Sequence, residues 1–359
     1  MTSRSPLPHL PLSRLTVALL AAGYLLAPWR LSDFWLSVLI YGGIAAIGAV
    51  GLNLLTGYTG QVSLGHAAFL GAGAYTAGYV GVDLGWPLPA WLVAAALAGG
   101  ALGALVGPAA LRLRGHYLGI ITLGLVLLAQ HIFQEWNALT GGATGRPTTL
   151  DASIAGVDFN ELTVLGQPFT REQSWFWLVW ALTGLAALAV ANIVRTRPGR
   201  AMQAVRDREV AAEMLGVSVT RYKIGAFVVA SALAAVAGAL QAGFQQYVSP
   251  SEWSLLLSIQ FLAMIIVGGL GSTTGAVLGA LFVGALPHLI DELSAGVPWL
   301  AGEQDSLISV FALNQIVFGL LIVLFLTLEP HGLAALWVRL RTHIARTPRW
   351  HALTRRRTG

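Results

Sequence analysis

Long apolar stretches that are almost free of charge constrain the fold of this chain more than any other feature. A stretch of about 20 mostly apolar residues forms a helix long enough to cross the hydrocarbon core of a bilayer. Inside that core the backbone N–H and C=O groups have no water to bind, so they must pair within the protein. We predict an all-α, polytopic membrane helical bundle of about ten spans, at residues 12–29, 34–55, 62–82, 88–111, 117–136, 174–194, 223–246, 255–270, 274–290 and 307–327.

The composition agrees with a chain that is surrounded by lipid. Hydrophobic residues make up 56% and charged residues 10%, whereas a typical soluble domain has about 25% charged residues. The net charge of +5 would suggest nucleic-acid binding in a soluble protein. Here the basic residues lie between the apolar stretches, so we expect them to set the topology, and we expect no nucleic-acid partner. The absence of cysteine excludes disulfides and thiolate metal sites.

The basic residues also predict how the chain is oriented. Ten spans place both termini on one side, and if that side is the cytoplasm, 18 of the 21 Lys and Arg residues are cytoplasmic. Only Arg30, Arg146 and Arg171 then lie outside, in agreement with the positive-inside rule. We therefore expect a multi-pass membrane protein with cytoplasmic termini. The tryptophans near the predicted outer ends are typical of an aromatic belt in contact with membrane lipid: Trp29, Trp35, Trp86, Trp91, Trp136, Trp175, Trp177, Trp253 and Trp299.

The predicted spans define the domain organisation. Residues 1–330 form a transmembrane domain, which includes a long extracytoplasmic loop at 137–173 and a cytoplasmic loop at 195–222. Residues 331–359 form a basic cytoplasmic tail that lies on the anionic leaflet or is disordered. The first span is either a retained helix, which we favour, or a signal peptide. The segment 255–290, which contains short Gly-rich stretches, forms either two short helices or one re-entrant pair.

The spans lack the ionisable groups that several classes of membrane protein need. No Asp, Glu, Lys or Arg lies deep in a predicted span, which argues against an ion-coupled carrier. The single lysine, Lys223, is followed by Ile224 and is not part of a Walker A motif, which requires Gly-Lys-Ser/Thr. Ser63 and His66 have no acidic neighbour in sequence that would complete a hydrolase triad. We expect no catalytic residue, no metal site and no cofactor in this chain.

The cytoplasmic loop contains a short helical pattern at 199–216. Small and apolar residues recur at helical spacing among charged ones, and Gly216 ends the pattern. Such a segment is either a solvated loop helix or a coupling helix whose small-residue face inserts into a groove on a cytoplasmic partner. We adopt the second interpretation, with the candidate coupling residues Arg200, Arg206, Asp207, Glu209, Ala211, Ala212, Glu213 and Gly216.

Two Gly-rich segments, 53–75 and 267–284, share clusters of Gly and Thr that are followed by small residues at steps of three and four. They indicate either tight helix packing or interrupted segments in corresponding halves of a transporter, which line the transport path. Polar side chains within the spans are candidates for lining that path or, alternatively, for interhelical hydrogen bonds. These candidates are Asn53, Gln61, Ser63, His66, Gln130, Gln241 and Gln260.

Five stretches in order along the chain resemble the permease subunits of branched-chain amino acid ABC transporters, of the LivM type. They are residues 51–73 (GLNLLTGYTGQVSLGHAAFLGAG), 111–123 (LRLRGHYLGIITL), 140–142 (TGG), 199–227 (GRAMQAVRDREVAAEMLGVSVTRYKIGAF) and 249–279 (SPSEWSLLLSIQFLAMIIVGGLGSTTGAVLG). The resemblance implies a permease of the bacterial inner membrane. Its implied partners are a second, related permease of the LivH type, two cytoplasmic ATPase subunits that use ATP, and an extracytoplasmic binding protein. It also implies that 199–216 docks on the ATPases, although Val210 stands where the family's first acid often sits and Arg208 where asparagine is common.

The resemblance implies an importer of branched-chain or similar small amino acids, because members of this family carry leucine, isoleucine and valine. Related systems carry urea or short amides, and a path without charged residues suits a zwitterion and a neutral amide equally. A stand-alone carrier or channel is disfavoured by the structured loop and by the absence of charge within the spans. An enzyme acting on lipid is disfavoured because the chain offers no acid–base pair.

Overall fold

The computed structural model shows a helical protein and describes residues 23–111, 117–154, 156–160, 162–164 and 167–295, with residues 316, 319, 320, 323, 324, 327 and 332–334. The helices are α2 (Asp33–Asn53), α3 (His66–Gly78), α4 (Leu88–Leu111), α5 (Tyr117–Glu135), α6 (Asn137–Thr140), α7 (Arg171–Arg195), α8 (Arg197–Asp207), α9 (Glu209–Met214), α10 (Val219–Gln245), α11 (Leu255–Gly268) and α12 (Thr273–Ala295). α2 and α3 continue into single π-helical turns, η1 (Leu54–Tyr58) and η2 (Tyr79–Asp83). Two 3₁₀ turns, η3 (Gly142–Thr144) and η4 (Pro250–Glu252), complete the set.

Five helices of the described chain are long and apolar enough to cross a membrane, namely α2 with η1, α4, α5, α7 and α10. α11 and the apolar part of α12 are shorter. The predicted spans 12–29 and 307–327 lie outside the described residues except for 23–29 and a few scattered positions, and so does the tail 331–359 except for 332–334. The helical fold is thus confirmed, while the total of about ten spans and the placement of the termini stay predictions.

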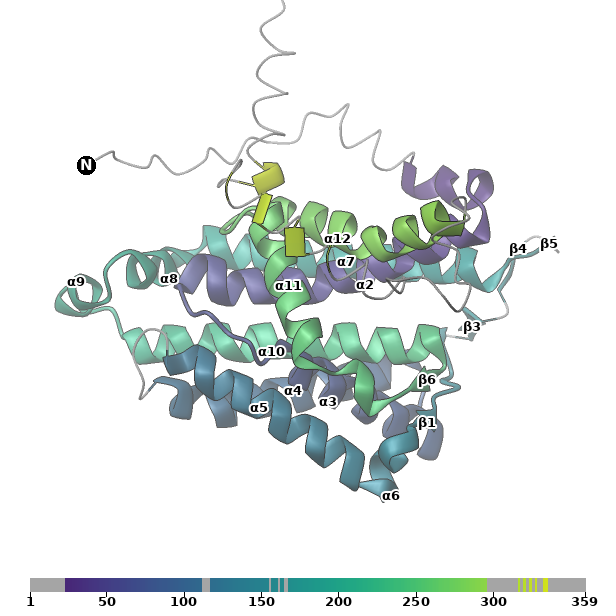
Figure 1. Ribbon diagram of the computed structural model, residues 1–359, viewed down its shortest axis with the longest axis horizontal. Helices are drawn as coiled ribbons and strands as arrows, with labels where there is room; N and C mark the ends of the chain where they lie inside the picture. The colour runs from purple at the N-terminus through teal and green to yellow at the C-terminus, as the bar shows by residue number, and fades with distance from the viewer. Residues whose placement is uncertain are drawn as a thin grey trace, which may run out of the picture.

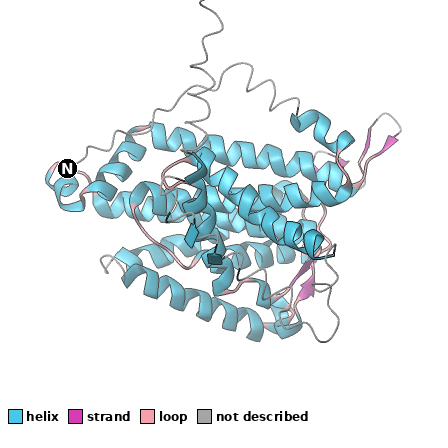
Figure 2. Cartoon of the chain, turned by 45° about the horizontal axis from the view of Figure 1, so that its top comes forward, coloured by secondary structure: helices cyan, strands magenta, loops and turns pink. Residues whose placement is uncertain are grey.

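The long helices lie side by side along the longest axis of the molecule, and different elements close its two ends (Figure 1). α8 and α9 lie at one end, which we call the α8–α9 end. Short strands lie at the opposite end (Figure 2), which we call the β end. α10 is central, because it packs against α2, α3 and α4, and α2 packs in turn against α7 and α12.

The predicted loop 137–173 contains short antiparallel strands at the β end. Arg146 within it forms a bidentate ion pair with Asp83, with N–O distances of 2.7 and 3.0 Å, and this interaction holds the pKa of Asp83 below its usual value. The loop is therefore fastened to the end of η2 and, through one of its strands, to the chain that follows α10. The pairs are β1 (Arg146–Pro147) with β6 (Tyr247–Val248), β2 (Ser153–Ile154) with β3 (Val157–Asp158), and β4 (Thr163–Val164) with β5 (Gln167–Pro168).

The predicted span 62–82 differs from the structure, because residues 60–65 are not helical and α3 begins only at His66. Non-helical backbone is tolerated at membrane depth only where protein groups satisfy it. Side-chain hydroxyls do so here. The Leu64 N–H donates to Thr122 Oγ1 of α5 (2.9 Å), and the Ala67 N–H donates to Ser258 Oγ of α11 (2.9 Å). Two other helices therefore hold the interruption in place.

The segment 255–290 lies in two helices, α11 and α12, which the turn 269–272 joins. Gly269 and Gly271 in this turn have φ values of 112° and 77°, a conformation that favours glycine. α11 has 14 residues and is about 21 Å long, which is less than the hydrocarbon thickness of about 30 Å. Figure 1 shows α11 running across the direction of the neighbouring helices.

The nine tryptophans predicted to form an aromatic belt differ in exposure: Trp177 is partly buried, and Trp299 lies outside the described residues. Trp29, Trp35, Trp86 and Trp136 are exposed, as an aromatic belt requires, whereas Trp91, Trp175 and Trp253 are fully buried. Trp91 donates its Nε1–H to the Asp151 carbonyl (2.9 Å) and Trp175 donates to Asn160 Oδ1 (3.1 Å). The expectation of one continuous belt is therefore wrong for the buried three, whose indole rings pack in the protein interior.

The close approach of α3 to α10 gives the first prediction. A Cβ atom at Gly73 would lie 2.0 Å from the Ala235 carbonyl oxygen, and a Cβ atom at Gly238 would lie 1.9 Å from the Leu70 carbonyl oxygen. We expect Gly73→Ala and Gly238→Ala each to destabilise the fold by about 1–3 kcal/mol, because the two helices must separate. The measurement is the midpoint of thermal unfolding in detergent.

Gly184→Ala in α7 is the matched control, because a Cβ atom there meets nothing within 4 Å. The same midpoint for all three variants would contradict the packing of α3 on α10.

Candidate functional site

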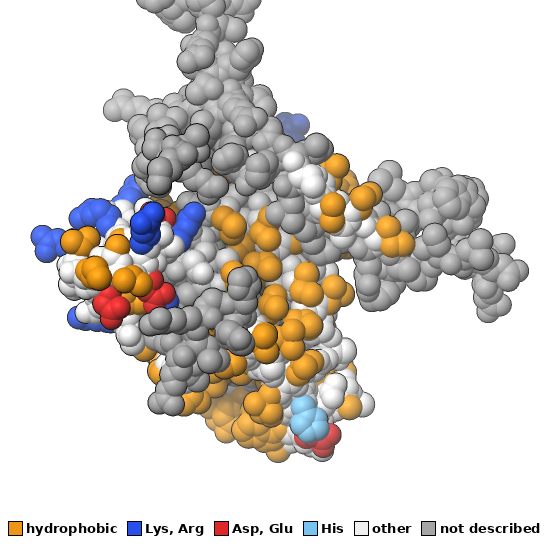
Figure 3. Space-filling view, turned by 60° about the vertical axis from the view of Figure 1, so that its left-hand side comes forward, with side chains coloured by type: hydrophobic (Ala, Val, Ile, Leu, Met, Phe, Trp, Pro, Cys, Tyr) orange, Lys and Arg blue, Asp and Glu red, His pale blue; other side chains and the backbone are white. Residues whose placement is uncertain are grey.

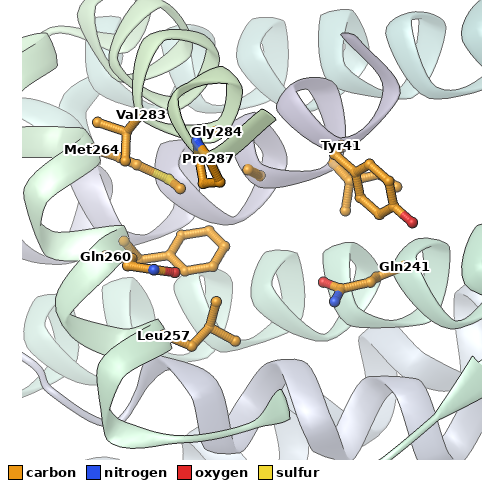
Figure 4. A pocket seen from close by; sticks show the side chains of 11 residues that line it. Tyr41, Gln241, Leu257, Gln260, Met264, Val283, Gly284 and Pro287 are labelled. Carbon is orange, nitrogen blue, oxygen red and sulfur yellow. The ribbon is translucent and has the colours of Figure 1, made fainter. Parts of the chain in front are cut away.

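A small cavity lies among α2, α10, α11 and α12. Its volume is about 190 Å³, which suits a small molecule, since a cavity of about 150 Å³ holds benzene. The cavity is nearer the β end, because Gln241 lines it from the last turns of α10. Figure 4 shows the side-chain amides of Gln241 and Gln260 on opposite sides of this space, with Tyr41 beside Gln241. The other lining residues are Ile44, Ala45, Leu257, Phe261, Met264, Val283, Gly284 and Pro287.

The lining of this cavity is mostly apolar with a few polar groups, which is typical of ligand sites. Its apolar walls suit an aliphatic group. The two glutamine amides provide both hydrogen-bond donors and acceptors on opposite sides, and no lining residue is charged. Among the described residues, no three His, Asp or Glu side chains gather into a group that could hold a metal ion.

The structure brings two candidate path residues, Gln241 and Gln260, into the cavity. His66 does not line the cavity. Its imidazole contacts the lining residue Phe261, with ring centroids 4.9 Å apart. Gln130 is partly buried on α5 and does not line the cavity.

Gln61 and Ser63 form hydrogen bonds that stabilise the interrupted segment 60–65. Gln61 Nε2 donates to Thr59 Oγ1 (3.0 Å) and to the Lys223 carbonyl (3.3 Å). Ser63 Oγ accepts from the Gly65 N–H (3.2 Å). Both side chains are buried. The bond from Gln61 to Lys223 reaches α10, whereas the bond of Ser63 is local.

Asn53 joins the two Gly-rich segments at the α8–α9 end of the bundle. Its Nδ2 donates to the Ser272 carbonyl (2.9 Å), and its Oδ1 accepts from the Gly271 N–H (3.0 Å). A Cβ atom at Gly57 would lie 2.5 Å from the Gly271 nitrogen, so glycine is needed for this approach. The two segments that the sequence analysis paired are thus in direct contact, through η1 and the turn 269–272.

The predicted coupling segment folds into two short helices, α8 and α9, and Arg208 between them has an extended backbone. Met202 of α8 is buried, and Val205 of α8 packs with Ala212 of α9 and Val219 of α10. The face of small residues that we expected to insert into a partner is therefore turned partly inward, against the start of α10.

The surface that α9 presents to solvent is apolar. Val210 is 63% exposed, and Met214 and Leu215 are each 84% exposed. Figure 3 shows hydrophobic side chains beside basic and acidic ones at this end. Exposed apolar clusters with a polar rim mark interaction sites. We call Val210, Met214 and Leu215 the α9 patch. The candidate coupling residues of α8, α9 and the following turn that are exposed are Arg200, Arg206, Asp207, Ala211, Glu213 and Gly216.

Glu209, another candidate coupling residue, forms an ion pair inside the chain. Lys223 Nζ lies 2.7 Å from Glu209 Oε2. The pair joins the start of α9 to the first turns of α10, so Glu209 helps to orient α9.

Arg206 connects α8 to the contact between the Gly-rich segments. Its guanidinium donates to the Gly57 carbonyl in η1. A Cβ atom at Gly271 would lie 3.1 Å from Arg206 Nη1, and one at Gly60 would lie 3.3 Å from Arg206 Cγ. Arg206 therefore lies beside both η1 and the turn 269–272, the two segments that Asn53 joins by hydrogen bonds. We call this contact between η1 and the turn the Asn53 joint.

Two functional features escaped the sequence analysis. Glu252 lies in η4 beside the cavity, since Gln241 Nε2 donates to Glu252 Oε2 at 3.4 Å. The sequence could have drawn attention to Glu252, because it is the only acidic residue between Glu213 and Asp291. The α9 patch left no such signal, because only the folded loop decides which apolar residues of α9 face solvent.

A family model described as the permease component of branched-chain amino acid transport systems matches residues 34–326. The chain is 32% identical over 247 residues to the LivM permease of the high-affinity branched-chain amino acid transport system of Salmonella typhimurium, and 31% identical over 247 residues to LivM of Escherichia coli K12. Each of these alignments covers 65% of this chain and 58% of the relative. The chain thus spans less than two thirds of the length of these LivM relatives.

Other relatives align with more of the chain. The LivH permease of Escherichia coli K12 is 27% identical over 304 residues, which is 81% of this chain and 91% of LivH. The ribose import permease RbsC of Haemophilus influenzae is 25% identical over 295 residues, which is 79% of this chain and 86% of RbsC. No solved structure matches the chain significantly.

The Asn53 joint gives the second prediction. We expect Asn53→Leu to lower the midpoint of thermal unfolding in detergent, because it leaves the Gly271 N–H and the Ser272 carbonyl without these partners, at about 1–3 kcal/mol for each group. Gln130→Leu is the control, since the described part of the chain offers the Gln130 amide no hydrogen bond. If both variants unfold at the midpoint of the unmodified protein, the joint does not stabilise the fold.

Proposed function

Because the chain belongs to the family of permease components of branched-chain amino acid transport systems, we propose that it is the membrane-spanning subunit of an ABC importer for branched-chain or similar small amino acids. Its proposed partners are a second permease of the LivH type, two cytoplasmic ATPase subunits and an extracytoplasmic binding protein. In this proposal the ATPases use the ATP, and the chain carries no catalytic residue and needs no cofactor.

The observation that carries the proposal is the connection between the α9 patch and the two Gly-rich segments, 53–75 and 267–284. The α9 patch is an exposed apolar surface with charged residues around it, which suits insertion into a groove on a partner protein. Arg206 on the adjacent helix α8 is hydrogen-bonded to Gly57. A partner that moves α8 and α9 therefore acts directly on the ends of the Gly-rich segments.

The proposed mechanism assigns different roles to the two ends of the bundle. The α8–α9 end faces the cytoplasm, as its basic residues favour, and the β end receives the loaded binding protein. ATP binding closes the ATPase pair and displaces α8 and α9. Arg206 transmits this displacement to η1 and to the turn 269–272, so that the path opens alternately to either side.

The cavity supports a small amino acid as the substrate. Its apolar walls suit an aliphatic side chain, and the amides of Gln241 and Gln260 suit the polar end of the molecule. Urea has no aliphatic group for these walls, although a short amide does, so an importer of amides with the same architecture is the second candidate. A ribose permease is among the relatives, which means that the family alone does not identify the substrate.

The α9 patch gives the third prediction. We expect the double variant Met214→Ser/Leu215→Ser to lose most of the ATPase that copurifies with the chain from native membranes, because the apolar contact is removed. Val157→Ser is the control, since Val157 is an exposed apolar residue of β3 (45%) at the opposite end. Undiminished copurification of the ATPase with the double variant would argue against docking through this patch. An isolated chain that moves substrate without any ATPase would mean a carrier or channel.

The link through Arg206 gives the fourth prediction. We expect charge reversal by Arg206→Glu or by Glu213→Arg to uncouple ATP hydrolysis from uptake in the reconstituted importer. Arg206→Glu replaces a charge-assisted hydrogen bond to Gly57, which is worth about 1.5–3 kcal/mol, by repulsion between a carboxylate and a carbonyl. The measurement is the amount of substrate transported per ATP hydrolysed.

Arg208→Glu is the matched control, because Arg208 is exposed and its side chain makes no hydrogen bond to the described residues. Normal uptake with both Arg206→Glu and Glu213→Arg would refute a coupling role for α8 and α9.

A further inference from the structure

Glu252 is an isolated carboxylate that two amides hold at the β end of the bundle. It lies in η4, between the strand β6 and the start of α11. Gln245 Nε2 donates to Glu252 Oε1 at 3.1 Å, and Gln241 Nε2 donates to Glu252 Oε2 at 3.4 Å. The bond from Gln241 is the longer and therefore the weaker of the two.

No cation neutralises this carboxylate within the described part of the chain. The two side-chain ion pairs found there are Arg146–Asp83 and Lys223–Glu209. Arg171 is engaged elsewhere, because its guanidinium donates to the Gly243 and Phe244 carbonyls at 2.9 and 2.7 Å. Glu252 is only partly exposed, and burial raises the pKa of its carboxyl above the usual value. A partly buried carboxylate without a counter-charge is costly unless a cation arrives.

The carboxylate lies directly beside the apolar cavity. Gln241 both lines the cavity and donates to Glu252. Figure 4 shows the Gln241 amide on the wall opposite Gln260, next to Tyr41. The Gln241 amide thus contacts the Glu252 carboxylate and also lines the apolar cavity.

We propose that Glu252 binds the ammonium group of the amino acid that enters from the β end, while the aliphatic side chain of that amino acid occupies the cavity. This proposal rests on the proposed function. The ammonium displaces the weak bond from Gln241, and the freed amide of Gln241 then donates to the carboxylate of the substrate. Glu252 would therefore distinguish an amino acid from a neutral amide, which has no cationic group.

A purely structural role is the competing explanation, because Glu252 also holds η4 against the end of α10. Two further variants separate the roles. Glu252→Asp keeps the negative charge at position 252. Gln245→Leu removes the stronger of the two hydrogen bonds to Glu252 but leaves the Glu252 carboxylate in place. A structural role predicts the greater loss for Gln245→Leu, and an ammonium-binding role predicts it for Glu252→Gln.

The test uses the importer copurified with its partners and reconstituted in liposomes with saturating binding protein. Leucine uptake, ATP hydrolysis and the unfolding midpoint are measured together. We expect Glu252→Gln to lower leucine uptake about tenfold or more, the effect of losing one hydrogen bond to a charged group. ATP hydrolysis stimulated by the binding protein should remain, Glu252→Asp should retain most uptake, and Gln245→Leu should lose less than Glu252→Gln.

Three outcomes would overturn the inference. Unchanged leucine uptake with Glu252→Gln removes the role of Glu252 and leaves the proposed function intact. Losses of uptake and of unfolding midpoint in Gln245→Leu that equal or exceed those in Glu252→Gln assign Glu252 to structure alone. Transport of urea but not leucine by the unmodified importer rejects the proposed substrate itself. This failure of the proposed function is seen in the unmodified protein, so it is distinguishable from a failure of the role of Glu252.

Discussion

The whole arrangement depends on pairing the backbone of one interrupted helix inside a bundle where water is not available. Residues 60–65 leave the helical path, and their polar groups must find partners on other elements. Thr122 of α5 accepts from the Leu64 N–H, and Thr56 of η1 donates to the Gln61 carbonyl (3.0 Å). The start of α3 is held by Ser258 of α11. The interruption is therefore stable only when these helices have assembled around it.

The interruption has a counterpart in the stretch 246–254, which precedes the short helix α11. There β6 pairs with β1, and Trp253 is fully buried. Because α11 starts from this stretch and runs across the bundle (Figure 1), Gln260 faces the same space as Gln241 of α10. The path of α11 thus brings polar groups from separate elements together in an otherwise apolar interior.

The cavity and the α9 patch lie at different depths, and α2 connects them. Tyr41 of α2 lines the cavity, whereas η1 at the other end of the same helix receives the hydrogen bond from Arg206. Well-packed helices transmit displacement because protein interiors are close-packed and only slightly compressible. Glycine at position 57 allows the turn 269–272 to approach, so a movement of α8 reaches α2 and α12 together. This connection gives the proposed coupling a physical route, since two sites become coupled when one movement changes the contacts of both.

The sequence by itself determined the helices, because an apolar run of about 20 residues has no other way to satisfy its backbone in lipid. It also predicted helical structure within the segment 199–216 and singled out the two Gly-rich segments. It left open whether the Gly-rich segment 53–75 is interrupted and did not locate the break at 60–65, because the hydroxyls that stabilise it lie far away in the chain. Nor did it separate the exposed Trp86 from the buried Trp91, or Gln241 in the cavity from Gln61 in a structural hydrogen bond. Only the tertiary structure decided these points, because the role of a polar or aromatic side chain depends on which distant groups the fold places beside it.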